Sequence, residues 1–429
     1  MQPLERISGQ LRAAMVPAGL AVIAAHAINA SLFHIDAPFY ERLLWLAAIV
    51  AASTTAAYYF PSQSRAMKGA IALSFGFPAL LFGIGIHASH VYQLGFNGSD
   101  FTGIPMLLAG LLLTAIGATV LVRLIHTWWR RLLLVPAGLA FAFFVVFPVT
   151  LSIFAINVAH VPCCDETPAG RGLAYEDVTF ETEQGRDLSA WFIASKNGAV
   201  VVTVHGAGSN RSTVMDEAEM LVKHGYGVLM VDVEGYGNSE GRMNAFGWAG
   251  ARDVHAATAY LKSRSDVDAN RIGGLGLSMG GEVLLHAAGE STDLKVVVAE
   301  GATSRTRDDV DELPGPMGLI IVPFWEVIET SIQLMTGEAP PPPLKDLVRQ
   351  IAPRRVLLIA AALPEEQDLM ALYVKEGGPS FEMWSIPESK HVGGFDLHRE
   401  EYEQHVVAFF DDALLGNTPN ASPQANSIP

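Results

Sequence analysis

The sequence predicts an α/β domain built on a mostly parallel eight-stranded sheet, preceded by an all-α transmembrane domain. Five long apolar runs fill the first 160 residues, whereas the rest of the chain alternates short apolar strands with helical segments. Such alternation is typical of a parallel sheet covered by helices on both faces. The chain of 429 residues is also 50% apolar and only 17% charged, a composition that indicates a membrane part.

Each apolar run has roughly 18 or more residues, which is enough to cross a bilayer as a helix. The runs are residues 13–33, 43–60, 70–91, 104–125 and 132–158. No small-residue cleavage site follows the first run and four more runs come after it, so we interpret it as an anchor and not as a signal peptide. Residues 1–160 are therefore predicted to form a transmembrane domain of about five spans.

The basic residues predict an orientation for these spans. The amino terminus and the second and fourth loops carry seven Lys or Arg residues, whereas the first loop carries one and the third none. Because positively charged loops stay in the cytoplasm, five spans place the carboxy-terminal domain outside it. The fifth run contains Pro136 and Pro148, and one span fewer would reverse this orientation.

The remaining residues are strongly acidic. Residues 1–160 hold eight of the 28 basic and four of the 44 acidic residues, which leaves a net charge near −20 for the rest. This charge argues against nucleic acid as a partner. The two cysteines, Cys163 and Cys164, are adjacent and lack the spacing of a zinc site, so we assign them no function and expect no metal or cofactor.

The chain after residue 160 is predicted to divide into a linker at 161–172, an α/β domain at 173–415 and a disordered tail at 416–429. The linker is rich in Pro, Gly and acids, and the tail lacks apolar residues. Strands are predicted at 178–183, 188–194, 200–204, 228–233, 271–277, 295–300, 356–361 and 380–386. Helices are predicted at 211–224, 248–264, 280–289, 366–375 and 399–415.

One serine lies at a predicted turn between a strand and a helix. In the stretch 271–282, Ser278 follows a short apolar strand, lies between Gly276 and Gly280, and precedes a helical pattern. Small residues on both sides permit the strained turn that exposes a nucleophilic serine above a sheet. Ser239 also matches Gly-x-Ser-x-Gly, but no helical pattern follows it, so the context selects Ser278.

At this point the chain resembles the α/β-hydrolase fold family of serine hydrolases. The resemblance covers about residues 173–415 and includes His205-Gly-Ala-Gly208, the loop 232–241, Gly276-Leu-Ser-Met-Gly280 and His391. It implies that the insertion at about 301–353 caps the active site. It also implies that the backbone N–H groups of Ala207 and Met279 stabilise an oxyanion.

A nucleophilic serine needs an imidazole base and an acid behind it. His391 is the best candidate base because it follows the last predicted strand, where the family places its histidine, and His398 and His405 are weaker rivals. For the acid we favour Glu366, just after the seventh strand, with Glu365 and then Glu300, at the end of the sixth strand, as alternatives.

The sequence therefore predicts a membrane-anchored serine hydrolase that cleaves an acyl ester of a small or lipid-like substrate through an acyl-enzyme. A peptidase or thioesterase with the same triad is an alternative, because the motifs do not separate an ester from an amide. A membrane transport or scaffold protein with a binding module is another. It would not need Ser278, His391 and the oxyanion loop together, which favours an enzyme.

Overall fold

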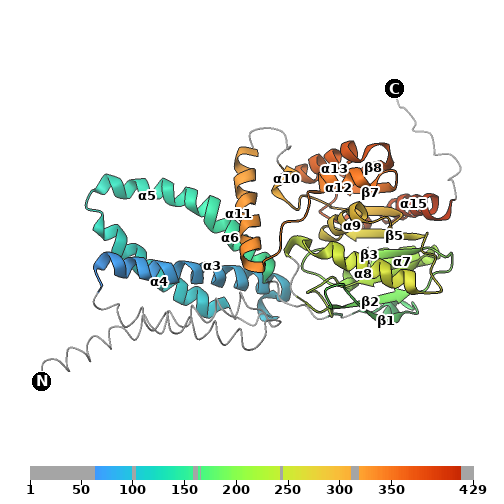
Figure 1. The fold of residues 1–429 in the computed structure, drawn as a ribbon, viewed down its shortest axis with the longest axis horizontal. Helices are drawn as coiled ribbons and strands as arrows, with labels where there is room; N and C mark the ends of the chain where they lie inside the picture. The colour runs from blue at the N-terminus through green and yellow to red at the C-terminus, as the bar shows by residue number, and fades with distance from the viewer. Residues whose placement is uncertain are drawn as a thin grey trace, which may run out of the picture. The chain divides into compact units, whose positions relative to one another are not determined.

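The computed structural model describes residues 63–98, 103–157, 163–164, 166–241, 245–310 and 318–416. The chain forms two compact units (Figure 1). Unit 1 comprises residues 1–159 together with Pro323–Ala339, and unit 2 comprises His160–Val322 with Pro340–Pro429. The first two predicted spans and the tail beyond residue 416 lie outside the described residues.

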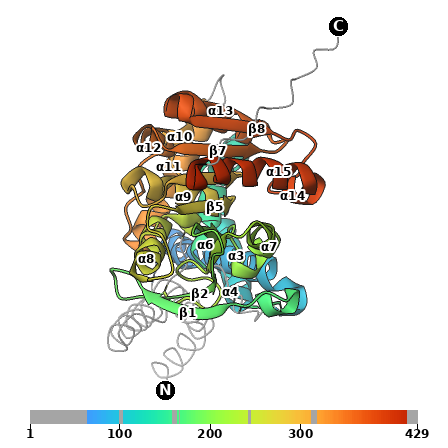
Figure 2. The same cartoon turned by 90° about the vertical axis from the view of Figure 1, so that its right-hand side faces the viewer.

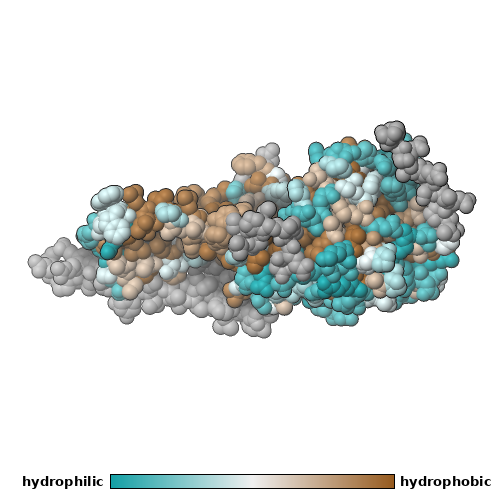
Figure 3. All heavy atoms as spheres, turned by 90° about the horizontal axis from the view of Figure 1, so that it is seen from above, coloured by the Kyte–Doolittle hydropathy of each residue, from teal (hydrophilic) through white to brown (hydrophobic). Residues whose placement is uncertain are grey.

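Unit 1 contains a succession of long apolar helices. Among the described residues they are α3 (Arg65–Gly98), α4 (Gly103–Leu124), α5 (Trp128–Phe141), the π-helix η2 (Ala142–Val146) and α6 (Phe147–Ile156). Three helical stretches, Arg65–Tyr92, Gly103–Leu124 and Trp128–Ile156, are long and apolar enough to cross a membrane. They coincide with the last three predicted runs, and the apolar side chains of unit 1 are visible as brown spheres in Figure 3.

Glycines bring the backbones of α3 and α4 together. They recur every seven residues on both helices, at 69, 76 and 83 on α3 and at 103, 110 and 117 on α4. A Cβ atom at Gly83 would lie 2.3 Å from the Leu107 nitrogen, and one at Gly110 would lie 2.3 Å from the Leu80 nitrogen. Small residues that let backbones approach this closely are typical of helix pairs in membranes, where lipid gives no hydrophobic drive for helices to associate.

Unit 2 is built on one eight-stranded sheet (Figure 2). The strands are β1 (Glu176–Glu181), β2 (Asp187–Ile193), β3 (Val200–Val204), β4 (Gly227–Val231), β5 (Ile272–Leu277), β6 (Val296–Glu300), β7 (Arg355–Ala360) and β8 (Phe381–Ser385). Their order in the sheet is β1-β2-β4-β3-β5-β6-β7-β8. The pairs β1/β2 and β2/β4 are antiparallel and all others are parallel. All eight predicted strands are confirmed, within two residues at each end.

Helices cover both faces of this sheet. They are α7 (Met215–Lys223), α8 (Gly250–Ser263), α9 (Met279–Glu290), α12 (Leu344–Ile351), α13 (Pro364–Gly377) and α15 (Arg399–Phe410). Neighbouring residues of a strand face opposite sides. In β5, a Cβ atom at Gly273 would meet Phe410 of α15, whereas one at Gly274 would meet Leu284 of α9. The helices α9 and α15 therefore cover opposite faces.

The connection from β6 to β7 leaves unit 2 and returns to it. It contains the short α10 (Arg307–Val310), the apolar helix α11 (Gly318–Thr336) and α12. Of this connection, Pro323–Ala339 groups with the helices of unit 1. The middle of the insertion that we expected to act as a cap is thus part of the apolar unit.

Candidate active site

Ser278 occupies a sharp turn between β5 and α9. Its backbone angles are φ 52° and ψ −122°, which are costly for a residue with a Cβ atom. The turn is so tight that a Cβ atom at Gly276 would lie 2.4 Å from the Gly280 carbonyl carbon, and one at Gly280 would lie 2.2 Å from the Val204 oxygen. Only glycine fits at either position, and this strained geometry lifts the Ser278 hydroxyl off the end of the sheet.

His391 lies on the loop after β8, and its ring reaches Ser278. The Nε2 atom of His391 is 2.9 Å from the Ser278 hydroxyl. The next residue, Val392, has φ 50°, so the loop is strained beside the ring. Gly301, directly after β6, lies against this ring, because a Cβ atom there would be 2.9 Å from His391 Cε1. Serine and imidazole are thus in hydrogen-bonding contact.

Glu366 lies on the other side of the imidazole. Its Oε2 atom is 2.9 Å from His391 Nδ1, and its Oε1 atom accepts a hydrogen bond of 2.6 Å from the Ala361 backbone N–H. The side chain is fully buried. Glu365 is exposed. The helix α13 begins at Pro364, two residues before the predicted start, and places both residues in its first turn, where only Glu366 faces inward.

Glu300, the other candidate acid, supports the histidine loop. Its Oε1 atom accepts a hydrogen bond of 2.8 Å from the Gly394 N–H, three residues beyond His391. Burial raises the pKa of the Glu300 carboxyl. The carboxylate that contacts the imidazole is therefore that of Glu366, whereas Glu300 binds the backbone of the loop that carries His391.

Hydrogen bonding sets the basicity of the imidazole. The bond to Glu366 raises the pKa of His391, and partial burial of the ring opposes this shift. The carboxylate favours the protonated ring because it accepts a hydrogen bond from Nδ1. In the neutral ring the same bond keeps the proton on Nδ1, which leaves Nε2 free to accept the serine proton.

The backbone at Met279 and at Gly206 borders the serine turn. Met279 is the first residue of α9, so its N–H has no acceptor within the helix. The loop after β3 passes close by, because a Cβ atom at Gly206 would lie 3.5 Å from Ser278 Cβ. The next residue, Ala207, is exposed.

His205 fixes how the peptide between Gly206 and Ala207 is turned. The Gly206 carbonyl oxygen is 2.8 Å from His205 Nδ1 and accepts another bond of 2.8 Å from the Ser209 hydroxyl. Carbonyl and N–H point in opposite directions across a trans peptide. The N–H of Ala207 therefore points away from His205. Burial lowers the pKa of His205, so the ring stays neutral and donates from Nδ1.

Comparisons with known proteins agree with this geometry. Residues 182–385 match the model of the X-Pro dipeptidyl-peptidase (S15 family). Together with the strand order and the strained serine between β5 and α9, this match decides the fold. Unit 2 has the α/β-hydrolase fold. The resemblance drawn from the motifs is thereby confirmed, and we call unit 2 the hydrolase unit.

The chain is similar to curated proteins of bacteria and plants and to solved structures. "Uncharacterized protein YfhR" of Salmonella typhi is 31% identical over 160 residues (34% of this chain, 53% of that protein), and that of Escherichia coli is 25% identical over 288 residues (63% and 94%). "Alpha/beta hydrolase domain-containing protein WAV2" of Arabidopsis thaliana is 33% identical over 121 residues (27% and 39%). The Pyrococcus furiosus esterase Pf2001 aligns at 24% identity with a TM-score of 0.48 (60% and 97%). The chain thus spans about half the length of some of these relatives.

Ser239, the rival serine, has a structural place in the hydrolase unit. It is buried, its hydroxyl donates a bond of 2.6 Å to the Asp232 carbonyl oxygen, and it accepts a bond of 2.8 Å from the Ser189 N–H. These bonds tie the loop after β4 to β2. A hydroxyl occupied in this way is not available to attack a substrate.

The rival histidines also have other partners. His398 Nε2 lies 2.7 Å from a carboxylate oxygen of Glu388, at the surface. The His405 ring packs edge-on against Trp384, with ring centroids 4.4 Å apart. His391 is thus the histidine that contacts Ser278.

The sequence reasoning missed a clamp on the loop after β6. Glu282, four residues after Ser278 in α9, accepts bonds of 2.9 Å from both the backbone N–H and the hydroxyl of Thr303. The Thr303 carbonyl oxygen accepts a bond of 2.9 Å from the Tyr373 hydroxyl. Glu282 lies one helical turn beyond the serine, and this spacing is the signal in the sequence that could have indicated its role in holding the loop after β6.

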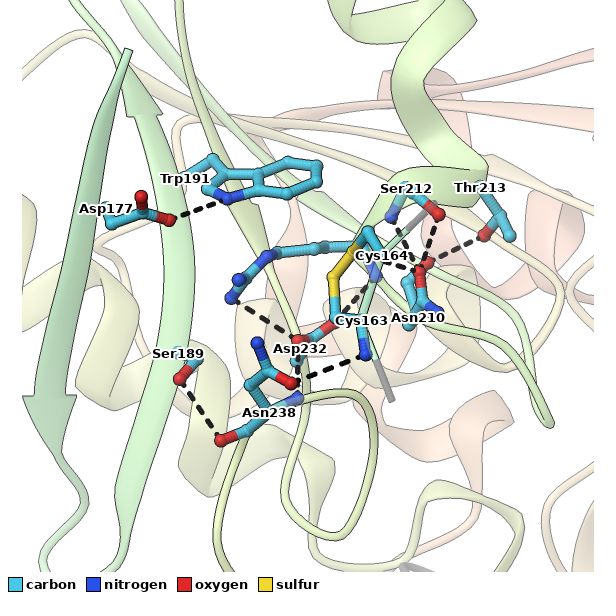
Figure 4. The surroundings of a disulfide bond; sticks show 11 residues. Cys163, Cys164, Asp177, Ser189, Trp191, Asn210, Ser212, Thr213, Asp232 and Asn238 are labelled. Atoms are coloured by element: carbon cyan, nitrogen blue, oxygen red, sulfur yellow. Dashed lines mark hydrogen bonds and ion pairs between the residues drawn. A yellow bond between two sulfur atoms is a disulfide. The ribbon is translucent and has the colours of Figure 1, made fainter. Parts of the chain in front are cut away.

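Cys163 and Cys164 form a disulfide between adjacent residues (Figure 4). The sequence analysis assigned no function to the pair. In the structure it contacts two loops of the hydrolase unit. The Cys163 N–H donates to Asn238 Oδ1 at 3.3 Å, and Cys164 Sγ lies 3.6 Å from Asn210 Oδ1. Among the described residues, no group of three or more His, Cys, Asp or Glu side chains is placed to hold a metal ion.

Proposed function

We propose that this chain is a membrane-anchored serine hydrolase that cleaves an acyl ester, with Ser278 as nucleophile, His391 as base and Glu366 as the acid behind it. The main support is the pair of 2.9 Å contacts that connects the three side chains in series. A serine hydroxyl is a poor nucleophile until an oriented imidazole takes its proton, and this arrangement supplies both the base and its orientation.

The reaction begins with attack of Ser278 Oγ on the ester carbonyl carbon. The hydroxyl proton passes to His391 Nε2, and Glu366 stabilises the imidazolium that forms. The carbon–oxygen bond to the alcohol then breaks, and the alcohol leaves with the proton from His391. A water molecule, deprotonated by the same imidazole, attacks the acyl-enzyme, which releases the carboxylic acid and restores the serine.

The negative charge that develops on the carbonyl oxygen needs donors already in place. In this proposal the N–H groups of Ala207 and Met279 supply them, one from the loop after β3 and one from the start of α9. Removing one such donor typically costs about 2.7 to 4 kcal/mol of transition-state stabilisation.

Covalent labelling with a fluorophosphonate tests this function. The wild-type protein should be labelled, Ser278→Ala should not be, and Ser239→Ala should be labelled like the wild type. Labelling of the Ser278 variant would overturn the assignment of the nucleophile. A wild-type protein that neither labels nor turns over acyl substrates would favour a non-catalytic role in transport or scaffolding.

Amide hydrolysis is the second candidate activity. The match to a family described as X-Pro dipeptidyl-peptidases favours it, because that name refers to cleavage after proline. Turnover of a panel of acyl esters, acyl thioesters and Xaa-Pro amides separates the possibilities. We expect the esters to give the highest kcat/KM, and a preference for the Xaa-Pro amides would make the protein a peptidase.

We also propose that unit 1 anchors the enzyme in a membrane, with the hydrolase unit outside the cytoplasm. Three described helices have the length and composition of spans, and the predicted count of five follows from the sequence. A periplasmic reporter fused after Leu415 should be active, and a cytoplasmic reporter there should not. The opposite result would show that the number of spans is even.

A further inference from the structure

The apolar helix α11 interrupts the hydrolase unit between β6 and β7, yet it packs among the helices of unit 1. The Phe324 ring lies 6.0 Å from that of Phe143 and 5.5 Å from that of Phe147, measured between centroids. The Ser152 hydroxyl lies 3.3 Å from the Ile328 carbonyl oxygen and donates to it. Ile332 is fully buried. The packing of α11 is therefore that of a helix of the apolar unit.

The consecutive segments α5, η2 and α6, of which η2 and α6 contact α11, present apolar side chains outward. The exposed ones on α5, η2 and α6 include Leu132, Leu133, Val135, Leu139, Phe141 and Phe147. On α11 itself, Leu334 is 81% exposed. A continuous apolar surface of this kind is not stable in water, and acyl chains are the covering that spans of this length and composition require. Both acidic residues of α11, Glu326 and Glu329, make interactions within the structure, as carboxylates at membrane depth must.

The outgoing end of the segment that carries α11 is fastened close to the active site, and the returning end is bonded to it. On the outgoing side, Glu282 holds Thr303, two residues beyond the glycine that lies against His391. On the returning side, the Lys345 N–H donates a bond of 3.2 Å to Asp309 Oδ1. Asp309 is also the acceptor for the outgoing backbone, because its Oδ2 atom lies 3.2 Å from the Arg305 nitrogen. The two ends are thus joined to each other at Asp309.

The length of the returning link limits how far α11 can be from these ends. Seven residues, 337–343, connect the end of α11 to the start of α12. Thr336 and Leu344 are eight residue steps apart, and an extended chain covers at most about 3.6 Å per step, so the link spans no more than about 29 Å. If α11 lies in a bilayer, the length of this link limits how far Lys345, and Asp309 to which it is bonded, can be from the bilayer.

We infer that α11 is embedded in the bilayer with the other helices of unit 1, and that the hydrolase acts on a long-chain acyl lipid taken from the membrane. This inference rests on the proposed function and adds the substrate class to it. The bond broken is the carbon–oxygen bond of a lipid ester, water is the second reactant, and a fatty acid and an alcohol are the products. The helix in place of a water-facing cap makes the membrane the source of the substrate.

The test uses the full-length protein in phosphatidylcholine vesicles and two esters that differ in chain length, p-nitrophenyl butyrate in solution and p-nitrophenyl palmitate in the vesicles. We expect the wild type to hydrolyse the palmitate at least 10-fold more efficiently. Leu334→Glu, which places a charge where only lipid should lie, should lower palmitate turnover at least 10-fold and leave butyrate turnover within about threefold. Leu397→Glu, at an apolar position of the hydrolase unit that is 48% exposed, is the matched control and should alter neither.

A nitroxide label on Leu334→Cys measures the depth of α11 directly. A position in the bilayer makes the label more accessible to oxygen than to a water-soluble nickel chelate, and the reverse would overturn the inference. A buried label without any preference for palmitate would overturn the substrate class alone. If Ser278→Ala abolishes butyrate turnover in that case, the proposed hydrolase function stands. If Ser278→Ala retains turnover of both esters, the proposed function itself fails.

Discussion

Replacing Glu366 by Gln should disable the imidazole through its tautomer. The Glu366 carboxylate uses one oxygen for His391 Nδ1 and the other for the buried Ala361 N–H. A glutamine has only one oxygen. If that oxygen stays on the Ala361 N–H, the amide NH₂ faces Nδ1 and can only donate to it. The proton of the neutral ring must then move to Nε2, where it blocks transfer from Ser278.

The structure gives a lower limit for the loss. Turning the amide round would restore the correct tautomer, but it would leave the Ala361 N–H buried without an acceptor, at a cost of about 1 to 3 kcal/mol. The amide orientation that keeps the proton on His391 Nδ1 is then populated about 5- to 150-fold less than the orientation that moves it to Nε2. Losing the negative charge that stabilises the imidazolium adds to this, and an Asp→Asn change in a serine-protease triad lowers kcat about 10⁴-fold. We therefore expect kcat to fall by about 10² to 10⁴.

The assay is steady-state turnover of a soluble acyl ester by Glu366→Gln, Glu365→Gln and Glu300→Gln, with circular dichroism to verify folding. Glu365→Gln should be near wild type because that side chain is exposed. Glu366→Ala should retain more activity than Glu366→Gln, since alanine does not impose the wrong tautomer. A folded Glu366→Gln variant within threefold of wild type would refute this reasoning, and a loss confined to Glu300→Gln would move the acid to the end of β6.

Three further outcomes follow from the structure. His205→Leu should free the peptide before Ala207 to rotate and should lower kcat about 10- to 100-fold with little change in KM. This loss is part of the 10²- to 10³-fold cost of a lost oxyanion donor. Unchanged steady-state kinetics would show that the loop keeps its conformation without His205. Gly110→Leu should lower the melting temperature in detergent because its side chain would meet the α3 backbone, whereas Gly138→Leu, with nothing within 4 Å, should be tolerated, and equal effects would contradict the close packing. Burial raises the pKa of Glu217 to about 8, so the folded state holds a proton that the unfolded chain loses near its ordinary value of 4.5, and stability falls as the pH rises between these values. Glu217→Gln should therefore raise the melting temperature at pH 8 but not at pH 4, a difference measurable by scanning fluorimetry, and a gain that is equal at both pH values would rule out this cause.

The positions of the strands and of the serine turn could be predicted because local signals and tertiary structure agree there. The apolar runs of β3 to β7 are buried on both faces, and such strands read as continuous hydrophobic segments. Gly276 and Gly280 are the residues at which any side chain would collide with backbone, so their presence in the sequence directly reports the tight turn at Ser278. His391 follows the last strand at the same end of the sheet.

Other features depend on contacts between residues far apart in the sequence. The start of α13 at Pro364 was available from the preference of proline for the first helical turn, and it would have shown that Glu365 and Glu366 face different ways around a helix. That α11 packs with the helices of unit 1 could not be predicted from the sequence in the same manner. An apolar helix in such an insertion has the same composition whether it covers an active site or packs among other apolar helices, and only the contacts of Phe324 and Ile328 distinguish the two.

The hydrogen bond from Lys345 to Asp309 has a consequence for how such a protein can arise. Because the two ends of the excursion lie next to each other, a chain that ran from Asp309 to Lys345 through a short turn would leave the sheet, the serine turn and the histidine loop unchanged. Segments whose ends are adjacent are the ones that proteins gain or lose as modules. A single insertion into a hydrolase without this helix is thus enough to acquire α11, and a single deletion would remove this apolar helix and keep the same sheet, serine turn and histidine loop.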